Sequence, residues 1–144
     1  MYFEDIPLHM TVDIGPVVIE KEKMMAFARE YDPIPLHTDE EYAKTTPFHD
    51  LIAPGVMSFM SIWAKYLEKD IAGTEVIAGK STKIEWHKPV YAGDVLTAKA
   101  EVTALTRRNE RNGILELTTT VQNQHGVTVL TNVTESVVKC RPKE

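Results

Sequence analysis

The stretch from Leu51 to Leu67 constrains the fold more than any other, because it is apolar on nearly every side until Lys65. It is too long for a typical strand, and a helix with so little polar surface has to be buried. Pro54 suits the first turn of such a helix, where its missing N–H removes no hydrogen bond. We therefore predict a buried central helix over residues 51–67, with Pro54 in its first turn.

The chain beyond Gly73 changes character and predicts a series of strands, after a single interrupted strand predicted at residues 12–19. Short runs of alternating apolar and polar residues indicate strands at residues 76–80, 83–90, 94–105, 114–124 and 127–138. The segment 109–113, which ends in Asn-Gly, predicts a hairpin turn. A long apolar helix needs a curved sheet to bury it. We therefore predict an α+β fold, a single hotdog domain over residues 1–144 in which an antiparallel sheet wraps around the central helix.

Charge and composition exclude several classes of protein. The 144 residues carry a net charge of −5 with acids and bases well mixed, so we expect no nucleic-acid partner. The single cysteine, Cys140, excludes an intramolecular disulfide and a cysteine-based zinc site, and no histidine pair has ligand spacing with a carboxylate. We therefore expect no metal. No apolar run is long enough to span a bilayer and no secretory leader begins the chain, so we expect a cytoplasmic protein with no membrane partner.

The segment from Asp32 to His37 is the place where the sequence holds an acid and an imidazole at a fixed spacing. Four residues separate the two side chains, and two of them are proline. Proline fixes its own φ and moves the preceding residue out of the helical region, so Asp32 and Ile34 are predicted to be extended. The whole segment is therefore predicted to be stiff and non-helical.

Helices are predicted on both sides of this segment. Residues 20–30 have the apolar spacing of an amphipathic helix, which leads directly into Asp32. Thr38 is predicted to cap a second, short helix that ends near Lys44, with Glu41 at the capping-box position. His37 is then expected just before a helix N-terminus.

Asp32 and His37 can act together as an acid–base pair on one water molecule. Histidine suits this task because it changes protonation near neutral pH, and Asp32 can polarise the same water or take its proton. The free N–H groups at the start of the central helix, above all that of Gly55, can stabilise negative charge on a carbonyl oxygen. These groups suit either the addition of water to an α,β-unsaturated thioester or the hydrolysis of a thioester, and neither reaction needs a metal or a redox cofactor.

A structural role is the alternative for these residues, and composition alone favours it. Asp before proline is also a turn signal, and a histidine near a helix start can simply bond a backbone carbonyl. The same interpretation covers His87 and His125 as ordinary strand or turn residues, and Ser58 and Ser61 as contacts of the central helix. Of these, Ser58 is the one that could touch a substrate.

Residues 27–43 resemble the signature of the MaoC-like dehydratases, the group of (R)-specific enoyl-CoA hydratases. That signature has Asp, any residue, Asn or Gln, Pro, an aliphatic residue or Phe, and then His, with Asp-Glu downstream. Two later blocks agree in order and spacing, at residues 52–55 (Ile-Ala-Pro-Gly) and 88–96 (Lys-Pro-Val-Tyr-Ala-Gly-Asp-Val-Leu). Three ordered blocks make the resemblance specific, and it spans most of the chain.

The resemblance implies a hotdog fold, a homodimer or higher homo-oligomer with active sites near the interface, and a hydro-lyase of fatty acid metabolism. Its reaction is the reversible addition of water to trans-2-enoyl-CoA, giving (R)-3-hydroxyacyl-CoA. The acyl-CoA thioester is the substrate, and no separate cofactor is implied. Asp32 matches the catalytic aspartate, His37 the catalytic histidine, and Gly55 the glycine whose N–H polarises the thioester carbonyl.

Two residues depart from the family pattern. Ile34 stands where Asn or Gln usually supports the active-site loop, and Pro54 replaces His or Ser before the glycine. Ile34 is expected to alter the substrate or to weaken the catalysis. Pro54 has no N–H, which leaves Gly55 as the more exclusive donor to the thioester carbonyl oxygen. Two alternatives therefore stay open: a hotdog thioesterase, which would release free thiol, and a non-catalytic acyl-CoA-binding subunit. Retention of both Asp32 and His37 favours the hydratase.

Overall fold

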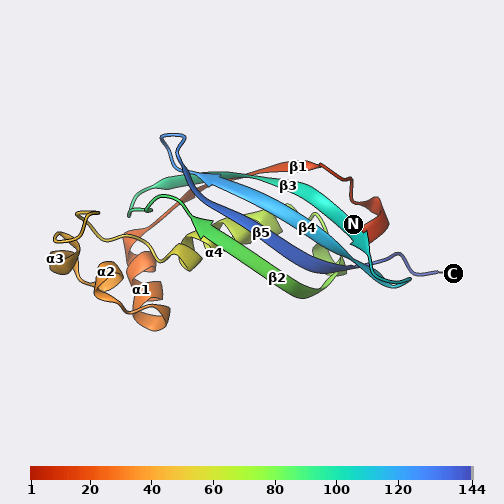
Figure 1. Ribbon diagram of the computed structural model, residues 1–144, viewed down its shortest axis with the longest axis horizontal. Helices are drawn as coiled ribbons and strands as arrows, with labels where there is room; N and C mark the ends of the chain where they lie inside the picture. Colours follow the sequence, from red (N-terminus) through yellow and green to blue (C-terminus); the bar gives the residue numbers. More distant parts are fainter. Residues whose placement is uncertain (144) are drawn as a thin grey trace.

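One helix, α4, lies against a five-stranded antiparallel sheet in the computed structural model, which describes residues 1–143 (Figure 1). The strand order across the sheet is β1-β3-β4-β5-β2. The elements in chain order are η1 (Phe3–Asp5), β1 (Thr11–Val18), α1 (Lys21–Tyr31), α2 (Pro35–Thr38), α3 (Glu40–Ala43), α4 (Gly55–Leu67), η2 (Gly73–Glu75), β2 (Val76–Trp86), β3 (Val95–Arg107), β4 (Asn112–Gln122) and β5 (Thr128–Lys139). The arrangement confirms the predicted hotdog architecture.

Strands β3, β4 and β5 form the centre of the sheet, as their alternating sequences predict. In β3 every second side chain is buried, namely Leu96, Ala98, Ala100 and Val102. The polar positions between them face away from the core, so one face of the sheet is available to α4. The predicted strands at 94–105, 114–124 and 127–138 are confirmed, and each boundary moves by no more than two residues.

The edge strand β2 corrects the prediction of two separate strands at 76–80 and 83–90. Ser81 and Thr82 pair with β5 and join the two runs into one strand, although the register shifts between Gly79 and Ser81. Almost every residue of β2 is exposed, so apolar alternation, which depends on one buried face, is not required along it. The predicted turn at 109–113 is also too long, since β4 already begins at Asn112.

The central helix begins later than predicted and is less enclosed. The Ala53 N–H donates to the Val90 carbonyl at 2.7 Å, and Ile52 forms an isolated bridge with Tyr91. These bonds keep the chain extended up to Pro54, which is the N-cap of α4 and precedes its first turn. The helix is apolar as predicted, but its predicted burial on nearly all sides is wrong, because the sheet covers one side and Val56 is 47% exposed.

The short helix predicted from Thr38 to Lys44 is replaced by two helical turns, α2 and α3. Proline favours the first position of a helix, and Pro35 begins α2 there. His37 therefore lies inside a helical turn and not before one, while Ile34 is extended as predicted (φ −86°, ψ 149°). The cap of the next turn is Asp39, whose carboxylate accepts the Tyr42 N–H at 3.1 Å, in place of the predicted Thr38.

The first strand is interrupted where the sequence predicts. The pairing of β1 with β3 shifts register between Ile14 and Val17, around Gly15 and Pro16. Gly15 has a φ of 102°, and a Cβ there would lie 2.8 Å from the Leu96 carbonyl oxygen, so glycine is needed at this bulge. In residues 1–143 no helix combines the length and apolar character needed to cross a bilayer.

Candidate active site

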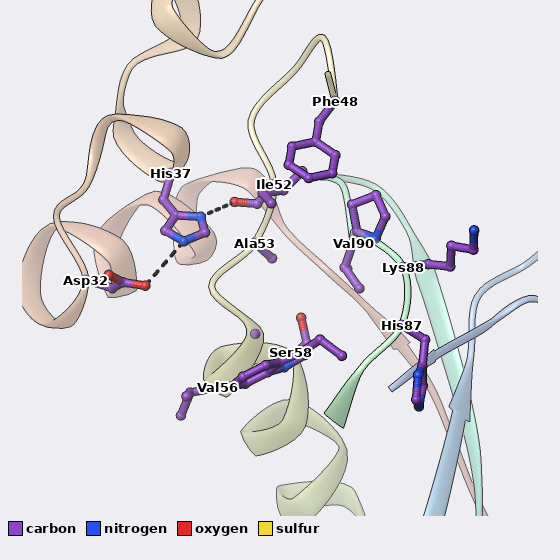
Figure 2. A pocket seen from close by; sticks show the side chains of 13 residues that line it. Asp32, His37, Phe48, Ile52, Ala53, Val56, Ser58, His87, Lys88 and Val90 are labelled. Atoms are coloured by element: carbon purple, nitrogen blue, oxygen red, sulfur yellow. Dashed lines mark hydrogen bonds and ion pairs between the residues drawn. The ribbon is translucent and has the colours of Figure 1, made fainter. Parts of the chain in front are cut away.

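A cavity of about 430 Å³ lies at the N-terminal end of α4, beside the end of α1 and α2 (Figure 2). Its lining comes from four parts of the chain: the end of α1 with α2, the loop before α4, the first turns of α4, and the end of β2 with the loop that follows. The lining residues are Asp32, His37, Phe48, Ile52, Ala53, Gly55, Val56, Ser58, Trp86, His87, Lys88, Pro89 and Val90. The three site residues predicted from the sequence are therefore brought together.

His37 is buried and held at both ring nitrogens. Its Nδ1 lies 2.6 Å from the Ile52 carbonyl oxygen, which can only accept a hydrogen bond, so Nδ1 carries the hydrogen. Its Nε2 lies 3.2 Å from Oδ2 of Asp32. Figure 2 shows the imidazole between these two partners. Nε2 is therefore the ring nitrogen that faces Asp32, whose side chain is 43% exposed at the cavity.

The local sequence positions this pair. Asp32 ends α1 as its C-cap, with its N–H bonded to the Ala28 carbonyl at 2.9 Å. Pro33 cannot continue the helix, and the chain turns so that the Ile34 N–H donates back to the Asp32 carbonyl. The turn of α2 that follows directs His37 toward Asp32. The pair is thus built within one short segment, whereas the carbonyl of Ile52 comes from a different one.

Gly55 contributes the first N–H of α4, which has no acceptor within the helix. A Cβ at Gly55 would lie 2.1 Å from Nε1 of Trp86, so the indole packs directly on the backbone of this residue. Only glycine permits that approach. The indole therefore forms a wall of the cavity beside the free N–H.

Several lining residues have no motif in the sequence that predicts them. His87, interpreted above as an ordinary strand residue, lines the cavity and bonds Thr131 Oγ1 through Nε2 at 2.9 Å. Trp86 and Val90 reach the cavity from the end of the edge strand and the loop after it. The nearest signal was the block 88–96 of the family resemblance, which contains Val90 and begins directly after Trp86 and His87.

Ser58 lies on α4 and is completely buried, and it also lines the cavity. Its Oγ has no hydrogen-bond partner among residues 1–143. Within the same part of the chain, no group of three or more His, Cys, Asp or Glu side chains is arranged to hold a metal ion.

The chain is similar to known proteins both in sequence and in fold. A sequence model of the family described as MaoC like domain matches residues 5–125. An (R)-specific enoyl-CoA hydratase from Aeromonas caviae is 36% identical over 106 residues, 73% of this chain and 73% of that protein. The uncharacterised protein YdeM of Bacillus subtilis is 30% identical over 122 residues, 84% of this chain and 86% of that protein. The crystal structure of a MaoC-like dehydratase from Rhodospirillum rubrum is 28% identical and has a TM-score of 0.88, covering 99% of each chain.

Proposed function

The chain belongs to the MaoC-like dehydratase family, and on this premise we propose that it adds water reversibly to trans-2-enoyl-CoA, giving (R)-3-hydroxyacyl-CoA. One observation carries the proposal: Asp32, His37 and the free N–H of Gly55 line the same cavity. An acid–base pair on one side and a donor for a carbonyl oxygen on the other are the groups that such a hydration needs.

Water activation falls to Asp32 and His37. With its Nδ1 hydrogen held by the Ile52 carbonyl, His37 can accept a proton only at Nε2, the nitrogen that faces Asp32. A water in the cavity that contacts both side chains loses one proton to Nε2 and donates its other O–H to the carboxylate. Its oxygen then bonds to C3 of the substrate as the C2=C3 π electrons move toward the thioester. The proton taken from water is returned at C2, so that the net change is the addition of one water.

The developing negative charge falls on the thioester carbonyl oxygen. The Gly55 N–H is the first donor of a 13-residue helix, whose N-terminus also carries a partial positive charge. A donor that is fixed before the reaction stabilises the enolate without reorganisation. Trp86, packed against Gly55, helps to keep water away from this oxygen.

The two departures from the family pattern affect this site unequally. Ile34 is 46% exposed and does not line the cavity, and its carbonyl bonds the His37 N–H at 3.0 Å. The backbone carbonyl of Ile34 therefore helps to hold His37 in place, whereas its apolar side chain can make no hydrogen bond. Pro54 is buried as the N-cap of α4, so the N–H of Gly55 is the first that the helix presents.

The proposal is tested by following the enone absorbance of short, medium and branched trans-2-enoyl-CoAs. Asp32→Asn and His37→Ala should each lower kcat/KM by about 10²–10⁴, the usual contribution of a positioned acid or base. His125→Ala is the matched control, because His125 is an exposed histidine in the β4–β5 turn and outside the cavity lining. It should retain the wild-type rate.

The same assay separates the alternatives when free thiol is measured in parallel. A hydratase removes the enone without releasing thiol. Release of free thiol would instead identify a thioesterase, and binding of acyl-CoA with neither change would identify a non-catalytic subunit.

A further inference from the structure

Two serines of α4 differ in how their hydroxyl groups are satisfied. Ser61 Oγ donates to the carbonyl of Met57 at 2.9 Å, the usual bond of a serine inside a helix. Ser58 is buried more completely, yet its Oγ has no partner among residues 1–143. Buried hydroxyl groups are nearly always hydrogen-bonded, because leaving one unpaired is unfavourable. The unpaired hydroxyl of Ser58 therefore calls for a partner that enters the cavity.

The position of Ser58 indicates which part of the substrate that partner is. Ser58 follows Gly55 by three residues on the same helix, and residues at this spacing lie side by side on one helix face. Both line the cavity, while Asp32 and His37 reach it from α1 and α2 (Figure 2). In the proposed reaction the carboxylate and the imidazole hold the water. The thioester carbonyl oxygen, by contrast, can accept two hydrogen bonds and has so far one donor.

We propose that the hydroxyl of Ser58 is a second hydrogen-bond donor to the thioester carbonyl oxygen, beside the N–H of Gly55. This inference rests on the proposed hydratase function and deepens it. An apolar acyl chain has no atom that would satisfy Oγ, whereas the carbonyl oxygen gains negative charge as water adds to C3. The hydroxyl then contributes most in the transition state, where that charge is greatest.

Ser58→Ala tests the inference, with Ser61→Ala as the matched control on the same helix. Loss of one oxyanion donor is expected to lower kcat by about 10²–10³ with little change in KM. The thermal midpoint of Ser58→Ala should equal or exceed that of the wild type, because the substitution removes a hydroxyl that is buried without a partner. Ser61→Ala should keep the wild-type kcat.

A spectroscopic measurement separates a contact with the substrate from a structural role. The carbonyl stretch of bound butanoyl-CoA, labelled with ¹³C at the thioester carbonyl, reports the hydrogen bonds to that oxygen. It should move to higher wavenumber in Ser58→Ala and stay unchanged in Ser61→Ala.

The outcomes are distinguishable. An active wild type with an unchanged kcat in Ser58→Ala would overturn this inference and leave the hydratase intact. The same holds for a rise in KM alone, or for lost activity with a lower thermal midpoint and an unmoved carbonyl stretch. A wild type that hydrates none of the enoyl-CoAs would overturn the proposed function and this inference together.

Discussion

Gly55 illustrates at the scale of one residue how a missing side chain shapes the site. The indole of Trp86 occupies the space that a Cβ would need, and the three nearest atoms to that position all belong to this ring. Trp86 is 54% exposed, so the ring has room to move outward. A larger residue at position 55 would therefore displace the cavity wall and shift the N–H donor, and the core would stay largely intact.

Gly55→Ala is accordingly expected to lower kcat/KM by about 10²-fold, because a displacement of about 1 Å in a site can cost that much. The displaced indole becomes more exposed, so its fluorescence should shift to longer wavelength. The measurement needs a Trp63→Phe background, since the chain has two tryptophans. Gly79→Ala is the control, because a Cβ there meets nothing within 4 Å. Full activity with unchanged fluorescence would contradict this account.

At the scale of elements, the short N-terminal turn η1 is joined to the chain end that follows β5. The Glu4 carboxylate accepts the Arg141 N–H at 3.0 Å and Nη2 of Arg107 at 3.1 Å. The backbone N–H of Arg141, followed by smaller contributions that include the guanidinium of Arg107, lowers the pKa of Glu4 from 4.5 to about 2. The ionised form of Glu4 is therefore favoured in the folded protein.

This shift predicts how stability depends on acid. Because the pKa of Glu4 is lower in the folded than in the unfolded chain, its contribution is present above about pH 4.5 and is lost as the pH falls toward 2. Glu4→Gln should lower the thermal midpoint at pH 7 by up to about 3 °C, since Glu4 is exposed and its contacts are screened by water. The difference from the wild type should narrow at pH 3.

Thermal unfolding at both pH values measures this effect, with Glu22→Gln as the control. Glu22 is an exposed acid of α1 for which residues 1–143 provide no ion-pair partner. A Glu4→Gln midpoint equal to that of the wild type at pH 7 would show that η1 and the chain end are not held together by this carboxylate.

At the scale of the whole molecule, the sheet order leaves β1 and β2 as its two edges. β2 is exposed along nearly all of its 11 residues, and it carries the exposed apolar side chains of Val76, Ile77 and Trp86. An edge strand presents unpaired N–H and C=O groups, which favour pairing with another strand. We therefore expect a second copy of the chain to pair along β2, which would place the Trp86 wall of the cavity close to the interface.

Gly79→Glu tests this expectation. Gly79 lies within β2, and the single chain leaves space for a side chain there, so the fold should tolerate the change. Between two copies, however, the substitution would bury like charges that repel each other. Sedimentation velocity should show twice the chain mass for the wild type and for Gly79→Ala, and a monomer for Gly79→Glu. A wild type that sediments as a monomer would contradict the prediction.

The sequence alone was sufficient for those features that depend on neighbours in the chain. The alternation of β3, β4 and β5, the amphipathic spacing of α1 and the interruption of β1 at Gly15 are local patterns, and the structure retains them. Asp32 and His37 could be selected for the same reason, because the proline-rich segment between them is visible in the sequence. Gly55 was selected by its place after Pro54 near the predicted start of the helix and by the family resemblance, although that start was predicted too early. Their proposed catalytic roles remain predictions.

The tertiary structure decided the features that depend on contacts between distant segments. The start of α4 at Gly55 follows from the bonds of Ile52 and Ala53 to the chain near Val90. The proton on Nδ1 of His37 is fixed by the Ile52 carbonyl, and the cavity wall is the indole of Trp86 on Gly55. Each of these contacts joins segments that are distant in the sequence, so local periodicity does not predict it. For the same physical reason, the unpaired hydroxyl of Ser58 could be seen only once its surroundings were folded around it.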